Sequence, residues 1–285
     1  MSKNTSSPFQ IIINAIVIIL AVLTAYAFIS EFTYDEYTYN VLPDDITNLD
    51  EEIEDFLLGL DPNFEDLLEN PDNSIQCELV YLDGNKSSLS DESNYKQSVK
   101  SVVYITAEDD DYIWYGSGSI ISSDGLVITN SHVIEDSHKV VVTTYEGRHY
   151  EVESVPAYDD LLDIAFLKIN ADGLDPLPIG NSDEVSVGQK TLVIGHAEGF
   201  LNTLSIGNVS AVRNYDSTEE GENIQITNPI SSGNSGGALL NDKGELIGVP
   251  TWSLEYEDNI FQVQNINFAV SINDAIELLN NSQSE

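Results

Sequence analysis

From residue 99 onward, the sequence alternates short runs of β-branched residues with turn signals. Such runs recur at intervals of about 8–12 residues, which is typical of an all-β sandwich or barrel. Turn dipeptides such as Asp124-Gly125 and Lys243-Gly244 separate neighbouring runs. A helix capped by Asn273 is predicted over Ile272–Asn280. The predicted strands are Val102–Thr106, Ser119–Ile121, Leu126–Thr129, Val140–Thr144, Ile164–Ile169, Thr191–Ile194, Asn208–Val212, Ile224–Thr227, Ala238–Leu240, Leu246–Val249 and Asn267–Val270.

The N-terminal part contains a different signal, an uncharged run of 19 residues at positions 11–29. This run is long enough to cross a bilayer as a helix. Lys3 is the only basic residue before it, so residues 1–10 are predicted to be a cytoplasmic tail and the rest to lie outside. The alternative is a cleaved signal peptide, because Ala25-Tyr26-Ala27 fits a small-x-small cleavage pattern. Both alternatives export the remainder of the chain.

Residues 30–97 are interpreted as an acidic stalk. Fifteen acidic residues and no basic residue occur between Glu31 and Asp72. Apolar residues nevertheless recur at helical spacing, from Ile46 to Leu60 and again from Phe64 to Leu68, which predicts one or two short amphipathic helices. We expect these helices to act as a spacer between the membrane and the next domain. The alternative is self-association or docking on that domain. Residues 87–93 are predicted to be a loop.

The whole chain is strongly acidic, with 49 aspartates and glutamates, 10 lysines and arginines and a formal net charge of −39. A surface of this sign repels nucleic acid and anionic lipid headgroups, so neither is an expected partner. We interpret the charge as a solvated acidic coat. A further hypothesis is adaptation to high salt, because molar salt shortens the Debye length to about 3 Å and weakens self-repulsion. The single cysteine, Cys77, excludes an intrachain disulfide and is interpreted as an ordinary thiol.

Three segments carry side chains that fit one kind of chemistry. His132 follows an apolar run, Asp163 precedes another at 164–169, and Ser235 stands among glycines in 233–237. Each residue alone is more typical of an ordinary structural position. Together they offer a hydroxyl, a base to take its proton and a carboxylate to orient that base, which acyl transfer by serine requires. The order His, Asp, Ser along the chain is one of the known orders of this triad.

The same segments support a resemblance to a known family. Residues 129–133, 163–168 and 233–237 read Thr-Asn-Ser-His-Val, Asp-Ile-Ala-Phe-Leu-Lys and Gly-Asn-Ser-Gly-Gly. They resemble the three signatures of the HtrA (DegP/DegS-like) family of trypsin-fold serine proteases, over about residues 98–280. The resemblance implies an all-β fold, a trypsin-like double β-barrel with a C-terminal helix, preceded here by the transmembrane helix and the acidic stalk. The barrels are expected at about 99–180 and 185–270, followed by a tail at 281–285.

The resemblance also implies roles for individual residues. Ser235 would attack the scissile carbonyl, and His132 would accept the serine proton and later protonate the leaving amine. Asp163 would hold the imidazole in the required tautomer. The backbone N–H groups of Gly233 and Ser235 would form the oxyanion hole.

Substrate contacts are expected on the second barrel. The strand around Thr251 and Trp252 would pair with extended substrate as an added β-strand. Ile230 lies where the wall of the pocket for the residue before the scissile bond should begin, which favours an uncharged, aliphatic residue there. Two departures from the family pattern stand out. His196 replaces a more usual Asn-Pro and receives no role, and Pro250 leaves substrate preference open.

Three functions fit these residues. The first is an extracytoplasmic serine endopeptidase of HtrA type that acts on unfolded or damaged proteins. The second is a catalytically inactive peptide binder or chaperone, and the third is an esterase, which the lack of a Gly-x-Ser-x-Gly elbow disfavours. The expected partners are extended polypeptide, the membrane through the N-terminal helix and, by family analogy, a homotrimer. No cofactor or metal site is expected. The family's PDZ domain is expected to be absent, because the sequence stops shortly after the last predicted helix.

Overall fold

The computed structural model describes residues 52–60, 63–82, 87–214, 222–253 and 265–283. All of them belong to one compact unit, Asp44–Glu285. The predicted cytoplasmic tail at 1–10 and membrane anchor at 11–29 lie outside the described residues. Within the described ranges, no helix combines the length and the apolar character needed to cross a membrane.

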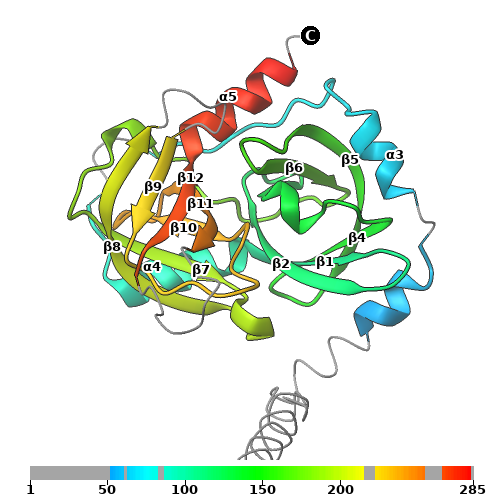
Figure 1. Cartoon of the computed structure of the whole chain (residues 1–285), viewed down its shortest axis with the longest axis horizontal. Coiled ribbons are helices and arrows are strands. Elements are labelled where there is room, and N and C mark those ends of the chain that lie inside the picture. The colour runs from blue at the N-terminus through cyan, green and yellow to red at the C-terminus, as the bar shows by residue number, and fades with distance from the viewer. Residues whose placement is uncertain (1–51, 61–62, 83–86, 215–221, 254–264, 284–285) are drawn as a thin grey trace, which may run out of the picture. The chain divides into compact units, whose positions relative to one another are not determined.

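The first barrel contains six antiparallel strands in the order β1-β2-β3-β6-β5-β4, and β4 pairs with β1 to close it (Figure 1). Closure leaves no free sheet edge. The strands are β1 Val102–Glu108, β2 Ile113–Ile120, β3 Leu126–Thr129, β4 Lys139–Thr143, β5 His149–Asp159 and β6 Ile164–Ile169.

The second barrel repeats this topology, because the ring β7-β8-β9-β12-β11-β10 has the same connectivity as the first. Its strands are β7 Lys190–Gly195, β8 Thr203–Asn214, β9 Glu222–Ile226, β10 Ala238–Leu240, β11 Leu246–Ser253 and β12 Asn267–Ser271. The all-β double barrel and the C-terminal helix that the sequence predicted are confirmed.

Helices complete the fold. Besides the helical residues 52–57, the described part of the chain contains the α-helices α3 Phe64–Glu69, α4 Asp91–Ser98 and α5 Ile272–Ser282. Short 3₁₀ helices lie at η1 Val99–Ser101, η2 Ser131–Val133, η3 Ser182–Glu184 and η4 Ala197–Gly199. α5 packs across both barrels, against β5 of the first and β11 and β12 of the second (Figure 1).

One hydrophobic cluster joins the two barrels. It contains Phe166 of β6, Leu192 of β7, Val249 of β11 and Leu279 of α5, all buried. Two further clusters fill the interiors of the individual barrels. Because these buried side chains come from both barrels, they hold the barrels as neighbours, and loops from both can contribute to one site between them.

Three elements differ from the sequence expectations. The strand β5 was not predicted, because it contains Pro156 and alternating charges and carries register shifts against β6. The N-cap of α5 is Ser271, whose hydroxyl accepts from the Asp274 N–H at 3.3 Å, so the assignment of Asn273 was wrong. Part of the loop predicted at 87–93 instead begins α4, with the Ser90 hydroxyl accepting from the Ser93 N–H at 3.2 Å.

The stretch of the acidic stalk around residues 52–69 packs on the first barrel. Residues 52–57 are helical, and Ile53 and Leu57 are each 1% exposed in a cluster with Tyr104 of β1 and Val141 of β4. The buried Phe64 joins the interior cluster of that barrel. The apolar residues at helical spacing therefore cover the wall of the first barrel. This corresponds to the alternative that the segment docks on the next domain, and it differs from the expectation of a free spacer.

This packing also covers His149, the first residue of β5. Its side chain is only 13% exposed. The ring lies 5.6 Å from that of Phe56 and forms a 2.9 Å hydrogen bond with the Thr143 hydroxyl. Burial lowers the pKa of His149, and the nearby Glu52 carboxylate opposes this effect. Docking of the segment therefore explains the burial of a polar residue on the barrel wall.

We expect Leu57→Ala to lower the free energy of unfolding by about 2–5 kcal/mol, because it opens a cavity under the docked helix. The matched control is Leu58→Ala, since Leu58 is 81% exposed and its loss should change stability by no more than about 0.5 kcal/mol. Urea unfolding of the full chain measures both. Equal effects of the two substitutions would contradict the docking of this segment.

Candidate active site

Strand pairing brings two of the three predicted triad residues together. β3 and β6 are antiparallel neighbours, with Thr129 opposite Ala165. His132 lies in η2, directly after β3, and Asp163 directly precedes β6. Because antiparallel strands end and begin at the same edge, the two side chains meet although 31 residues separate them.

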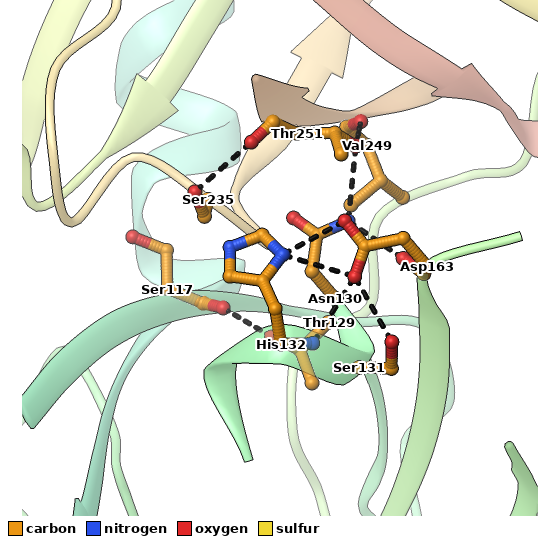
Figure 2. Close-up of polar contacts among 9 residues, drawn as sticks. All are labelled: Ser117, Thr129, Asn130, Ser131, His132, Asp163, Ser235, Val249 and Thr251. Atoms are coloured by element: carbon orange, nitrogen blue, oxygen red, sulfur yellow. Dashed lines mark hydrogen bonds and ion pairs between the residues drawn. The ribbon is translucent and has the colours of Figure 1, made fainter. Parts of the chain in front are cut away.

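The imidazole of His132 and the carboxylate of Asp163 form a close pair (Figure 2). The His132 Nδ1 lies 2.9 Å from Asp163 Oδ1 and 2.8 Å from Oδ2. Oδ1 also accepts from the His132 backbone N–H at 3.1 Å and from the Ser131 hydroxyl at 3.0 Å. A carboxylate acceptor at Nδ1 places the ring proton there and leaves Nε2 as the basic nitrogen.

Asp163 has a left-handed backbone conformation, with φ at +56°. Aspartate tolerates this region better than most residues, yet the conformation still needs support. The buried Asn130 supplies it by donating to the Asp163 carbonyl at 2.7 Å. The same amide donates to the Thr251 hydroxyl at 2.9 Å, which connects the first barrel to β11 of the second.

Ser235 lies in residues 227–237, the segment between β9 and β10 that we call the Ser235 loop. Its hydroxyl donates to the Thr251 carbonyl at 3.3 Å, and no hydrogen bond joins it to His132 among the described residues. Figure 2 shows the imidazole between Asp163 and Ser235. Proton transfer to Nε2 therefore requires that the hydroxyl turns away from Thr251, and such bonds commonly tighten only when substrate is bound.

Ser117 of β2 fixes the Ser235 loop from the first barrel. Its N–H donates to the Ser235 carbonyl at 2.8 Å, and its hydroxyl donates to the Gly233 carbonyl at 2.6 Å. The Ser117 carbonyl in turn accepts from the buried Thr129 hydroxyl at 2.7 Å. The backbone of the loop is thus held on both sides of residue 234.

The two expected oxyanion donors lie on this loop. Gly233 has φ at +86°, a conformation that favours glycine. Within the described ranges, the N–H groups of Gly233 and Ser235 have no hydrogen-bond acceptor. Both donors are therefore available to a ligand.

The predicted substrate residues occupy different positions. Thr251 touches the site directly, through its carbonyl to Ser235 and its hydroxyl to Asn130. Trp252 is 39% exposed and stacks on Phe268 of β12, with ring centroids 3.9 Å apart. Ile230 is half-buried against the interior cluster of the second barrel. The structure thus brings Thr251 to the triad and leaves Trp252 on the surface.

Sequence reasoning gave no role to Ser117, Asn130 or Ser131, although Asn130 and Ser131 stand inside the motif at 129–133. Their positions next to Gly116, Gly118 and His132 were the available signal. Short motifs do not reveal which polar side chain turns toward a distant loop.

Cys77 lies outside the candidate site. Burial and the Asp124 carboxylate raise the pKa of its thiol, which disfavours the reactive thiolate and agrees with the interpretation of an ordinary thiol.

His196, which received no role, is only 3% exposed. Its Nδ1 accepts from the Asn202 N–H at 3.1 Å, and its ring contacts Tyr104 edge-on at 5.3 Å between centroids. Burial lowers the pKa of His196 to about 4, and a backbone contact with Val103 opposes the effect only in part. The imidazole is therefore neutral at physiological pH.

We expect Gly233→Ala to destabilise the protein by about 2 kcal/mol or more. A Cβ at this position would lie 2.4 Å from the His196 carbonyl oxygen in addition to the strain of a positive φ. The matched control is Gly147→Ala, because Gly147 has φ at +76° and open space around its Cβ position, so that only about 1 kcal/mol is lost. Thermal unfolding of both variants measures the difference, and equal losses would contradict the close contact.

The buried His196 should make stability depend on pH. Its folded pKa lies below the unfolded value near 6.5, so the unfolded chain binds the proton first as the pH falls. Stability from this residue is complete above about pH 6.5 and decreases toward pH 4, by about 3 kcal/mol. We expect the difference in unfolding free energy between wild type and His196→Phe to shrink by this amount between pH 7 and 4. Urea unfolding across this range tests it, and a constant difference would contradict the lowered pKa.

Comparisons with known proteins agree with this geometry. The family model of the trypsin-like peptidase domain matches residues 116–249. The serine endoprotease DegS of Haemophilus influenzae is 39% identical over 167 residues, which are 58% of this chain and 48% of the relative. A Chlamydia trachomatis relative named "Probable periplasmic serine endoprotease DegP-like" is 42% identical over 138 residues, 48% of this chain and 28% of the relative. The chain thus spans about half or less of these curated relatives.

Solved structures show the same likeness. The serine endoprotease from Yersinia pestis has a TM-score of 0.59 at 30% identity, covering 70% of this chain and 68% of that one. The HtrA-type protease AlgW with tripeptide has a TM-score of 0.62 at 28% identity, covering 68% of this chain and 64% of that one. The sequence motifs, the double barrel and these likenesses agree, and the chain belongs to the HtrA-type family of trypsin-like serine proteases.

Proposed function

We propose that this chain is a serine endopeptidase that hydrolyses peptide bonds in unfolded or extended polypeptides outside the cytoplasm. One observation carries the proposal: the Asp163 carboxylate holds Nδ1 of His132 at 2.8 Å, with the ring placed between Asp163 and Ser235 (Figure 2). This arrangement supplies a base of defined tautomer beside a hydroxyl, which acyl transfer by serine needs.

The proposed reaction follows from these contacts. The Ser235 hydroxyl turns from the Thr251 carbonyl to Nε2 of His132, loses its proton and attacks the substrate carbonyl. The imidazolium that forms is stabilised by Asp163 and then protonates the leaving amine. Water repeats the sequence on the acyl-enzyme and releases the product. The side chain of His132 is 43% exposed, so the hydrolytic water can reach it.

The oxyanion of the tetrahedral intermediate is proposed to accept from the N–H groups of Gly233 and Ser235. Support comes from the fixed backbone around them, because Ser117 holds the carbonyls of both residues. Donors that are already in place need no reorganisation during the reaction, and one such donor typically contributes about 3–4 kcal/mol to transition-state stabilisation.

Extended substrate is proposed to lie along the end of β11, at Thr251 and Trp252. The exposed Trp252 ring offers an apolar surface there, backed by its stacking on Phe268. Ile230, an uncharged residue, is proposed to line the pocket for the residue before the scissile bond. These assignments favour an aliphatic residue over lysine or arginine at that position.

Several finer features complete the proposal. Attachment to a membrane through residues 11–29 and exposure of the barrels on the outer side follow from the sequence alone. The periplasmic location in the name of one relative is consistent with this placement. A homotrimer and a requirement for high salt are also proposed, the latter because a net charge of −39 strains the folded chain in dilute buffer.

A peptide-binding protein without activity is the second candidate. It is favoured by one observation, the orientation of the Ser235 hydroxyl toward Thr251 rather than His132. Hydrolysis separates the two functions, because a binder retains casein without cleaving it.

We expect the full chain to cleave casein, and Ser235→Ala to lower the rate by about 10⁴-fold or more, since the nucleophile is lost. Ser186→Ala is the matched control, because Ser186 lies in an exposed turn between the barrels and should keep wild-type activity. Cleavage is followed in dilute buffer and in about 1 M KCl, where screening should raise both activity and melting temperature. A folded wild-type chain that binds but does not cleave casein in either buffer would favour the binder.

A further inference from the structure

The segment after β7 lies against the backbone of the Ser235 loop. We call residues 196–202, between β7 and β8, the His196 loop. The Glu198 N–H donates to the Ser232 carbonyl at 2.7 Å. The His196 N–H donates to the Ser117 hydroxyl at 3.0 Å, and that hydroxyl donates to the Gly233 carbonyl at 2.6 Å. The His196 loop therefore holds the Ser232 carbonyl directly and the Gly233 carbonyl through the Ser117 hydroxyl.

The bond from Glu198 fixes the direction of one expected oxyanion donor. Ser232 C=O and Gly233 N–H belong to the same planar trans peptide, so they point in opposite directions. With the carbonyl held toward Glu198, the Gly233 N–H points away from the His196 loop. A rotation of this peptide would break the 2.7 Å bond and turn the donor away from its present direction.

The backbone conformation of the loop that carries the Glu198 N–H is energetically unfavourable. Glu198 has φ at 51° and ψ at 32°, and Asn202 has φ at 59°, so two non-glycine residues of the loop are left-handed. Such conformations persist only where surrounding contacts determine them. Two turn bonds, Gly199 N–H to the His196 carbonyl at 3.1 Å and Phe200 N–H to the Ala197 carbonyl at 2.8 Å, act within the loop.

The His196 ring provides the contact that closes the loop. Its Nδ1 accepts from the Asn202 N–H at 3.1 Å, so the first and last residues of the loop are joined through this imidazole. The ring is buried and lies edge-on to Tyr104 of β1, 5.3 Å between centroids. The loop is thereby fastened to the wall of the first barrel.

We propose that His196 is a positioning residue for catalysis: by accepting the Asn202 N–H, it holds the loop that keeps the Ser232–Gly233 peptide turned for oxyanion binding. The inference rests on the proposed protease function. The residue touches no reacting atom, and its side chain acts through Glu198 and Ser232. Its effect should therefore appear in transition-state stabilisation and not in ground-state substrate binding.

Two substitutions of His196 test its hydrogen-bond acceptor and its aromatic ring separately. His196→Phe keeps an aromatic ring beside Tyr104 but has no acceptor, and a cavity of about 130 Å³ lined by Tyr104, Leu201 and His196 leaves room for it. His196→Asn keeps an acceptor one bond from Cγ, where Nδ1 stands, but loses the ring. His138→Phe is the matched histidine control, because His138 lies beside Glu65 and Asp110 on the first barrel.

Steady-state cleavage of a peptide substrate by the full chain gives the first readout. We expect His196→Phe to lower kcat by about 10²-fold, the loss typical of one oxyanion donor, with KM changed by less than about threefold. His196→Asn should stay within about fivefold of wild-type kcat, and His138→Phe should match the wild type. Wild-type kcat for His196→Phe, or equal losses for both His196 variants, would overturn the inference.

Hydrogen exchange at the Glu198 amide gives a second readout that does not need activity. We expect faster exchange in His196→Phe and near wild-type exchange in His196→Asn, because only the first variant lacks the acceptor. If the wild type cleaves nothing but exchange follows this pattern, the proposed protease function fails, while the finding that His196 holds the loop stands. Unchanged exchange in His196→Phe overturns the positioning role whatever the activity.

Discussion

Ser117 of the first barrel donates from its backbone to Ser235 and from its hydroxyl to Gly233, both in the second barrel. The candidate site depends on such bonds, because His132 and Asp163 come from one barrel and Ser235 from the other. A displacement of about 1 Å between reacting groups can lower a rate by about a hundredfold. The site therefore needs more than two stable barrels, since their relative position must also be fixed.

The apolar cluster between the barrels contributes most to fixing their relative position. Phe166, Leu192, Val249 and Leu279 come from both barrels and α5, and all are buried. Dense packing resists deformation but has little directional preference. The polar contacts of Ser117 and Asn130 add the directional part, and both bridge the boundary within a few residues of the triad. The hydrophobic core brings the barrels together, and the hydrogen bonds align the loops.

The acidic segment before the first barrel contacts a part of the molecule other than the candidate site. The described acidic segment uses Ile53, Leu57 and Phe64 to cover the first barrel, while its carboxylates face outward or approach histidines. His138 lies between Glu65 at 3.4 Å and Asp110 at 3.3 Å. Apolar contact thus holds the segment in place, and the surrounding negative charge opposes compaction unless it is screened.

The sequence by itself determined the fold class and the residues of the candidate triad. Alternating β-branched runs and turn dipeptides predict strands because side-chain period and turn chemistry are local properties, and β3, β6 and β10 have the predicted bounds. The strand β5 was missed because Pro156 and bulges weaken the local pattern, and tertiary pairing overrides it. Likewise, the local signal for a cap favoured Asn273, whereas Ser271 is the residue that the fold places at the helix start.

Only the tertiary structure decided which polar groups support the triad and where the acidic segment lies. Ser117 and Asn130 form hydrogen bonds over separations of more than 110 residues, and His196 acquires its partners Tyr104 and Asn202 only when a barrel wall and a loop come together. Amphipathic spacing indicates that a helix has an apolar face but not what covers it. Local pattern specifies conformation within a few residues, whereas burial and long-range hydrogen bonding depend on how distant segments pack.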